Sequence, residues 1–170
     1  SGSVEATDIN NAASTTATFS DNVTATITNS GTLLFDATDA KSVTGTISEA
    51  AGGDTTEVQV INSANSEAPS VVTFTGTVAA DTLTIGTTTY GGAALFEDDV
   101  TVPTINVVGG DHADEDSTAT FNKAVTASSG ITLNDQTGDA KVIFAANNSV
   151  TITGTIDGAS SDEGTIQVTG

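Results

Sequence analysis

The chain has 170 residues and a formal net charge of −19, because 22 Asp and Glu residues are balanced by only three Lys and no Arg. A surface of this charge repels nucleic-acid phosphates and anionic lipid headgroups, so we expect no nucleic-acid partner and no acidic membrane partner. The chain contains no Cys and a single His, His112, which excludes disulfides, thiol nucleophiles and multi-histidine metal centres. These absences favour a protein that is not an enzyme.

Apolar residues alternate with Thr along most of the chain, which predicts β-strands. The clearest segments, in chain order, are 24–28, 71–78, 82–85 and 150–156. Between such segments lie turn-forming sequences such as Asn29-Ser30-Gly31, Gly91-Gly92 and Gly109-Gly110-Asp111. No window shows a helical pattern, and no apolar run approaches the length of about 18 residues that membrane insertion requires. We therefore expect one repetitive all-β domain over residues 1–170.

All six Phe residues share one local pattern, in which an apolar residue stands two positions before Phe and a Val follows after a short polar stretch. Successive Phe residues are separated by 16, 39, 22, 25 and 23 positions. This spacing predicts a parallel β-helix, or β-solenoid, of about seven coils with a period near twenty residues. One or two interior stacks would then contain Phe19, Phe35, Phe74, Phe96, Phe121 and Phe144. The alternative fold is a β-sandwich whose subunits exchange strands.

A longer internal duplication relates residues 15–61 to residues 117–170. Thr16-Ala17-Thr18-Phe19 recurs as Thr118-Ala119-Thr120-Phe121, and both copies contain the sequence Asp-Ala-Lys, which ends at Lys41 and at Lys141. We interpret this sequence as a surface turn with a local ion pair rather than as a site of lysine crosslinking. Because the chain begins with Ser rather than Met, we expect it to be a mature or excised piece of a longer product.

Two phrases, Val72-Thr73-Phe74-Thr75-Gly76-Thr77-Val78 and Ser149-Val150-Thr151-Ile152-Thr153-Gly154-Thr155-Ile156, resemble the threonine-rich repeats of bacterial surface proteins. The similar families are the passenger regions of autotransporter adhesins and some surface-layer proteins. The resemblance covers most of the chain. It implies a right-handed parallel β-helix that acts as an extracellular or cell-surface stalk, coat or adhesin. Cell-surface glycans are an expected partner of such a protein.

Open solenoid ends expose unpaired strand edges, so we also expect self-association or continuation into neighbouring repeats of a longer protein. The predicted function is therefore that of a structural or adhesive protein of a surface layer, stalk or filament.

Two other functions compete with this one. A carbohydrate-binding or carbohydrate-cleaving phage tail spike would use paired carboxylates such as Asp98 and Asp99. Tyr90 is the only Tyr and the chain has no Trp, so aromatic sugar platforms are scarce and a solvated turn is the better interpretation. An ice-binding protein would use a flat array of Thr pairs such as Thr82 and Thr84. Thr is also an ordinary residue of exposed strands, and the repeat lengths are irregular.

The densest charge cluster lies at residues 111–116 and contains His112 among four carboxylates. Calcium relieves the mutual repulsion of clustered carboxylates through six to eight oxygen ligands. The spacing is not that of an EF-hand, and a solvated acidic turn is the alternative interpretation. As a hypothesis, calcium is the cofactor of this loop, and its predicted ligands are Asp111, Asp114, Glu115 and Asp116.

Overall fold

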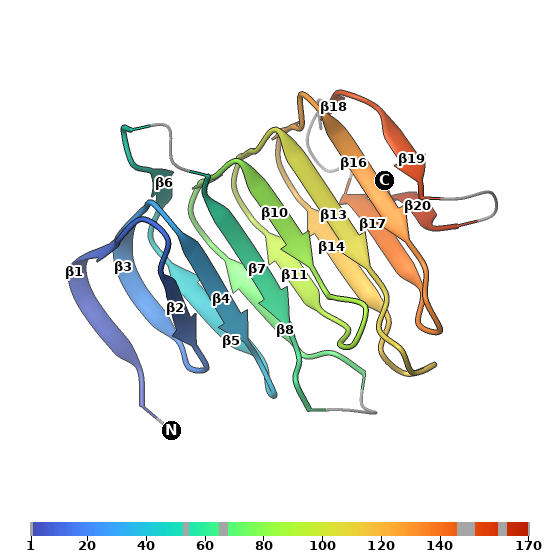
Figure 1. The fold of residues 1–170 in the computed structure, drawn as a ribbon, viewed down its shortest axis with the longest axis horizontal. Helices are drawn as coiled ribbons and strands as arrows, with labels where there is room; N and C mark the ends of the chain where they lie inside the picture. Colours follow the sequence, from blue (N-terminus) through green and yellow to red (C-terminus); the bar gives the residue numbers. More distant parts are fainter. Residues whose placement is uncertain (1, 53–54, 65–67, 146–151, 160–162, 170) are drawn as a thin grey trace.

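The computed structural model describes residues 2–52, 55–64, 68–145, 152–159 and 163–169. These residues form twenty β-strands and no helix, so the described segments include no helix that could cross a membrane. The strands stack in parallel as a β-solenoid of about six turns (Figure 1). The predicted fold class is confirmed, with slightly fewer coils than the seven expected. The sandwich alternative is wrong, because the strand pairs are parallel between successive coils rather than antiparallel.

One face of the solenoid is a seven-stranded sheet that contains one strand from each coil. In spatial order its strands are β19 (Ile156–Gly158), β16 (Gly130–Asn134), β13 (Thr104–Val108), β10 (Thr82–Ile85), β7 (Glu57–Ile61), β4 (Thr32–Asp36) and β2 (Thr16–Phe19).

The other two faces belong to a thirteen-stranded sheet. The first contains β5 (Lys41–Thr44), β8 (Val71–Phe74), β11 (Ala93–Phe96), β14 (Ser117–Phe121), β17 (Ala140–Ala145) and β20 (Thr165–Thr169). The second contains β6 (Ile47–Glu49), β9 (Val78–Ala79), β12 (Val100–Thr101), β15 (Val125–Thr126) and β18 (Ile152–Thr153). The long strand β3 (Val23–Asn29) joins the two faces, and β1 (Val4–Asn11) pairs along the other edge of β3.

A glycine marks the corner at which the two faces separate. Strand β3 runs straight through, whereas the next coil divides into β5 and β6 at Gly45, whose φ is 118°. A Cβ at this position would lie 2.1 Å from the carbonyl oxygen of Ala25 in the preceding coil. The left-handed backbone and the close approach of two coils therefore both require glycine here.

Inward-facing residues of successive coils lie in register and form continuous apolar columns. One column, in the seven-stranded sheet, contains Ala17, Leu33, Val58, Leu83, Ile105, Ile131 and Ile156. From Leu33 onward its members are 22 to 26 residues apart, so the coils are longer than the predicted twenty residues. Leu33, Leu83 and Ile105 are fully buried.

The six Phe rings form one continuous series of contacts, with centroids 5.0 to 5.8 Å apart from each ring to the next. Phe19 and Phe35 belong to the seven-stranded sheet, and the other four belong to the first face of the thirteen-stranded sheet. The series crosses between sheets through an edge-to-face contact of Phe35 with Phe74. The prediction of inward-pointing Phe stacks is confirmed: five rings are buried, and Phe19 at the N-terminal end is half-buried.

The two copies of the predicted duplication occupy partly different places in the coil. Leu33 and Leu133 both face inward from the seven-stranded sheet. Phe19 lies in that sheet as well, whereas its sequence counterpart Phe121 lies in the thirteen-stranded sheet. Similar phrases therefore form strands on different faces, and the duplication stays a sequence prediction.

Candidate functional site

The four predicted calcium ligands lie on one loop but point to different partners. Glu115 is 1% exposed and its Oε2 accepts a hydrogen bond from the backbone N–H of His112 at 3.2 Å. Asp116 accepts the backbone N–H of Asp139, in the next coil, at 2.8 Å. Asp111 is exposed and lies 3.6 Å from Nε2 of His112. Asp114 is also exposed.

Glycines from three coils surround the buried Glu115. A Cβ at Gly110 would lie 2.5 Å from Oε2 of Glu115, and Cβ atoms at Gly91 and Gly138 would come within 2.7 Å of its backbone carbonyl. Within the described ranges, no three His, Asp or Glu side chains are grouped closely enough to hold a metal ion. The structure therefore does not bring the predicted ligands together, and calcium binding stays a prediction.

Several carboxylates link one coil to the next, which explains part of the acidic composition. We call Asp36, Asp81, Asp99, Asp116 and Asp135 the bridging aspartates, because each accepts a backbone N–H 23 to 29 residues away at 2.8 to 3.2 Å. Asp135, for example, accepts N–H groups from both Ala140 and Gly164. Backbone N–H groups at the corners have no partner in the sheets. The aspartate carboxylates accept these N–H groups in charge-assisted hydrogen bonds.

Of the paired carboxylates Asp98 and Asp99, the first caps its own turn and the second bridges to the next coil. Oδ1 of Asp98 accepts the N–H of Asp99 at 2.9 Å, and Oδ1 of Asp99 accepts the N–H of Ala124 at 3.2 Å. Both carboxyl groups therefore hold the turn between β11 and β12 rather than face each other across a cleft. This geometry suits a structural turn.

Lys41 has the local ion pair that the Asp-Ala-Lys sequence predicts. Its ammonium contacts Asp39 and lies 3.6 Å from Asp21, and its side chain is 12% exposed. The hydrogen bond to Asp39 raises the pKa of Lys41 above its ordinary value of 10.5, although partial burial opposes the shift. Lys41 is therefore protonated at the start of β5.

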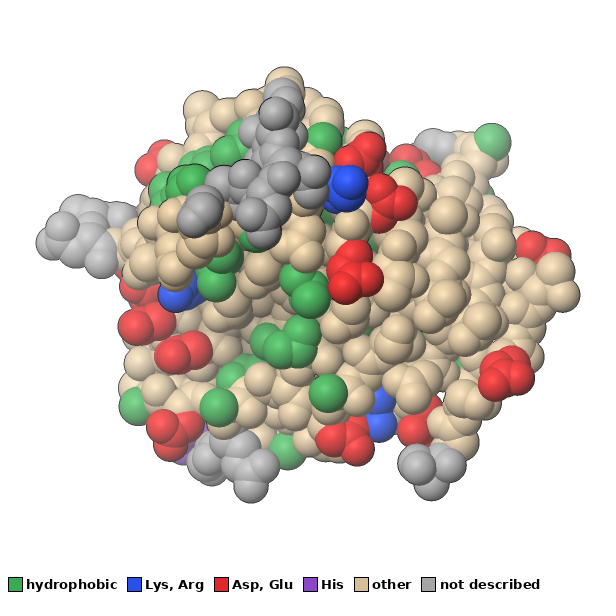
Figure 2. All heavy atoms as spheres, turned by 180° about the vertical axis from the view of Figure 1, so that it is seen from behind, with side chains coloured by type: hydrophobic (Ala, Val, Ile, Leu, Met, Phe, Trp, Pro, Cys, Tyr) green, Lys and Arg blue, Asp and Glu red, His purple; other side chains and the backbone are tan. Residues whose placement is uncertain are grey.

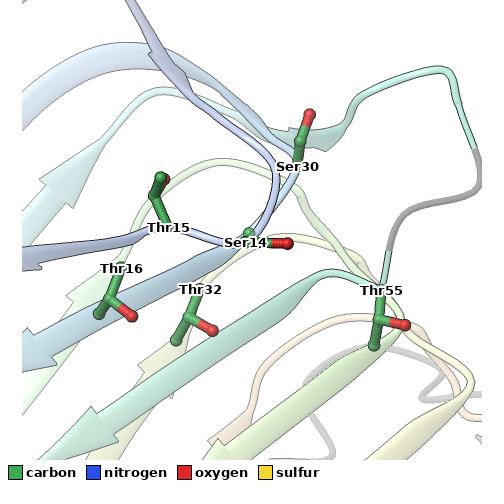
Figure 3. Close-up of a pocket in the computed structure, with 7 residues that line it drawn as sticks. Ser14, Thr15, Thr16, Ser30, Thr32 and Thr55 are labelled. Carbon is green, nitrogen blue, oxygen red and sulfur yellow. The ribbon is translucent and has the colours of Figure 1, made fainter.

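A shallow hollow of about 290 Å³ lies at the N-terminal corner of the seven-stranded sheet (Figure 3). It is lined by Ser14, Thr15, Thr16, Ser30, Gly31, Thr32 and Thr55. Ser14 has a φ of 58°, which is uncommon for a residue other than glycine. The hydroxyl of Thr15 is used internally, because it donates to Asn11 and Ala12. Hydroxyls from three separate coils can therefore meet a polar ligand here, without a carboxylate or imidazole in the lining. Sequence reasoning missed this hollow, since no motif marks it.

The outer surface of the seven-stranded sheet carries two rows of mostly polar residues in register. One row contains Thr16, Thr32, Glu57, Thr82 and Thr104. The other contains Thr18, Leu34, Gln59, Thr84, Asn106 and Thr132. Neighbouring strands of a sheet are about 4.8 Å apart, so these groups form a regular array. Glu57 interrupts the hydroxyls of the first row, and Leu34, Gln59 and Asn106 interrupt those of the second.

The C-terminal end of the solenoid exposes apolar side chains. Among the described residues, the exposed large apolar side chains are Val4, Val71, Ile152, Ile166 and Val168, of which the last three belong to β18 and β20. Figure 2, in which the C-terminal end lies on the left, shows hydrophobic side chains gathered toward that half of the face and a mostly polar half opposite. In the described part of the chain, the apolar columns of the core thus end in exposed side chains on β18 and β20.

Comparisons with known proteins add no assignment: no family model, no curated protein and no solved structure matches the chain.

Proposed function

We propose that the chain is an extracellular, non-enzymatic structural or adhesive protein that forms part of a surface layer, stalk or filament. The observation that carries this proposal is the unbroken stack of in-register coils, in which the column from Val23 to Val168 runs through the whole solenoid. A stack of this kind is a rod whose length follows from the number of coils. Such a rod suits the work of a spacer or coat.

The exterior supports the same role. The bridging aspartates fasten adjacent coils at the corners, and the strands between them present Thr, Asn and Gln to solvent. The net charge of −19 keeps such rods from collapsing onto one another. A durable polar rod requires neither a catalytic cleft nor a cofactor.

Surface location is tested directly in the cells that produce the protein. An antibody raised against the chain should label intact cells, and protease added outside should remove the label without lysing the cells. A protein that resists the protease until the membrane is opened would contradict the proposal.

The adhesive part of the proposal involves glycans at the hydroxyl hollow. Sugar hydroxyls match the donors and acceptors of Ser14, Ser30 and Thr32. Binding to a glycan array should decrease in Thr32→Val, which keeps the side-chain shape. Thr104→Val, in the same outward row but outside the hollow, is the matched control. Equal binding by both variants would argue against this location.

A second candidate function is ice binding, and the regular rows on the seven-stranded sheet favour it. Thr82 and Thr84 both point outward from β10, as a flat hydroxyl array requires. Thermal hysteresis of the purified chain tests this candidate. We expect the interruption of the rows by Glu57 to prevent it, so measurable hysteresis would favour ice binding over the structural role.

A further inference from the structure

Strand β20 has a neighbour on one side only. It pairs with β17 over Thr165–Thr169 without a shift in register, and no described strand lies along its other edge. Its sequence, Thr-Ile-Gln-Val-Thr, contains no charged residue. A straight, uncharged and uncovered edge strand is a template for the addition of another strand.

The inner coils show which backbone groups of β20 face the open edge. The carbonyl of Phe74 accepts the N–H of Glu97, and the carbonyl of Phe96 accepts the N–H of Asn122, each at 2.9 Å. In this column, the backbone polar groups therefore point to the following coil. Val168 continues the same column, and alternate residues of a strand point their backbone groups to the same side. Ile166 and Val168 thus present N–H and C=O groups to the open edge.

The side chains of the same two residues are the uncovered end of the core. Ile166 continues the column of Val142, and Val168 continues that of Phe144. Val142 and Phe144 are 0% and 2% exposed, whereas Ile166 and Val168 are 51% and 71% exposed. From Val72 and Phe74 onward, coil-to-coil contact buries both columns, so the same kind of contact with a further strand would bury them here.

The N-terminal edge is built differently. The register of β1 with β3 shifts between Glu5 and Asp8, and both residues place carboxylates on the edge strand. Bulges and charges are the devices by which proteins block the pairing of edge strands. The N-terminal edge of one copy therefore offers a poor match for the C-terminal edge of another.

We propose that two copies of the chain join tail to tail, through antiparallel pairing of β20 with β20 of the second copy, centred on Gln167. The sequence is nearly symmetric about this residue, so Thr165 opposes Thr169 and Ile166 opposes Val168. The pairs of Ile166 with Val168 are hydrogen-bonded pairs, because both residues present their backbone groups to the open edge. Gln167 opposes its own copy at a non-hydrogen-bonded position on the outer surface.

This arrangement is a two-fold, self-complementary interface, and the two apolar interiors meet across it. It closes on itself, so it yields dimers rather than chains of unlimited length. The net charge of −19 on each copy opposes association, and added salt screens that repulsion. The dimer therefore strengthens as ionic strength rises. The inference goes beyond the proposed surface role and holds for the purified chain.

Sedimentation velocity over a range of concentrations tests the proposal. We expect the wild-type chain to shift from monomer to dimer between about 0.02 M and about 0.5 M salt. Val168→Lys should weaken the dimer by about tenfold or more, even though it lowers the net negative charge. Val4→Lys, the matched change at the N-terminal end, should leave the dimer unaffected. Equal weakening by both variants, growth beyond the dimer, or a monomer at every salt concentration would overturn the proposal.

Covalent trapping gives an independent test that does not depend on the stability of the lysine variants. The chain has no Cys, so Gln167→Cys introduces a single thiol, and opposed residues at a non-hydrogen-bonded position are about 4.5 Å apart between Cα atoms. Mild oxidation should convert most of this variant to a disulfide-linked dimer. Thr7→Cys on β1 should remain monomeric. Equal crosslinking of both variants would mean random collision and would refute the tail-to-tail interface.

Discussion

The middle coils and the C-terminal coil repeat one pattern of inward-facing residues but differ in what covers them. Phe96 and Phe121 are each 1% exposed, whereas Val168, two coils beyond Phe121 in the same column, is 71% exposed. Val168 has no described strand beyond it, so the covering strands account for much of the burial of a core residue. In a solenoid, stability is shared between neighbouring coils, so the same substitution should have different effects in the middle and at an end.

The largest expected effect tests this contrast within the Phe series. Phe96→Ala removes a fully buried ring stacked between Phe74 and Phe121, and it should lower the free energy of unfolding by about 3–5 kcal/mol. Phe19→Ala, at the half-buried N-terminal end, has one ring neighbour and should cost about 1–2 kcal/mol. Denaturant unfolding of both variants measures the difference. Equal losses of unfolding free energy in the two variants would show that burial in the stack does not determine how much each ring stabilises the fold.

The next largest effect concerns a buried amide between the first coils. The side chain of Asn29 is 0% exposed; it donates to the carbonyls of Gly31 and Glu57 and accepts from the side chain of Asn11. Asn29→Ala leaves these buried groups without their partner and should cost about 2–3 kcal/mol. Asn10→Ala, at an exposed neighbouring position, should change stability by less than about 0.5 kcal/mol. A loss below 1 kcal/mol in Asn29→Ala would mean that water replaces the amide.

The core was predictable from the sequence because it follows two simple periods. Alternation with Thr gave the strands, and recurrence of Phe over a longer distance gave the coil. Alternation distinguishes the inside from the outside, but it does not say which face of the coil a strand joins. Phe19 and Phe121 stand in identical phrases and still lie in different sheets, because loop lengths between them place the strands on different faces.

The candidate sites were less predictable because they depend on contacts between coils. Asp36 accepts a hydrogen bond from Ser63, and no sequence pattern announces a partner 27 residues away. Glu115 belongs to a cluster that the sequence presents as solvated, yet it is buried because glycines of adjacent coils leave room for it. The hollow beside Ser14 depends on a left-handed backbone at a serine, for which the sequence carries no signal.

A smaller effect is expected where a bridging aspartate joins the last two coils. Asp135→Ala removes the acceptor of the Ala140 and Gly164 N–H groups and should cost about 1–2 kcal/mol, since both hydrogen bonds are partly buried. Asp135→Asn keeps an acceptor oxygen and should lose less. Asp114→Ala, on an exposed loop, is the control and should be close to neutral. Thermal melts of the three variants rank them, and an equal loss in the Ala and Asn variants would attribute the effect to charge rather than to hydrogen bonding.

The ion pair of Lys41 should make a contribution that depends on pH. Its folded-state pKa is raised above 10.5, so the fold favours the protonated ammonium. This stabilisation is fully present below the unfolded-state pKa and is lost as the pH rises through the folded-state pKa. The stability difference between wild type and Lys41→Met should therefore shrink at alkaline pH. Lys123→Met, at an exposed position, is the control for the loss of one positive charge. A Lys41 difference that stays constant through this alkaline range would contradict the ion pair.

The smallest expected effect concerns calcium at the loop of residues 111–116. A complete site would raise the free energy of unfolding by about 1.4 kcal/mol when free calcium is roughly tenfold above its dissociation constant. Glu115 instead points into the protein and Asp116 holds the Asp139 amide, so binding through all four predicted ligands would require the loop to rearrange. We therefore expect a shift well below that value. Melting curves with calcium, with magnesium and with chelator measure it, and the series is repeated for Asp114→Ala. A stability gain of about 1.4 kcal/mol that is specific to calcium and lost in Asp114→Ala would establish the site. It would also show that the loop rearranges to bind the ion, because the observed hydrogen bonds hold Glu115 and Asp116 away from such a site.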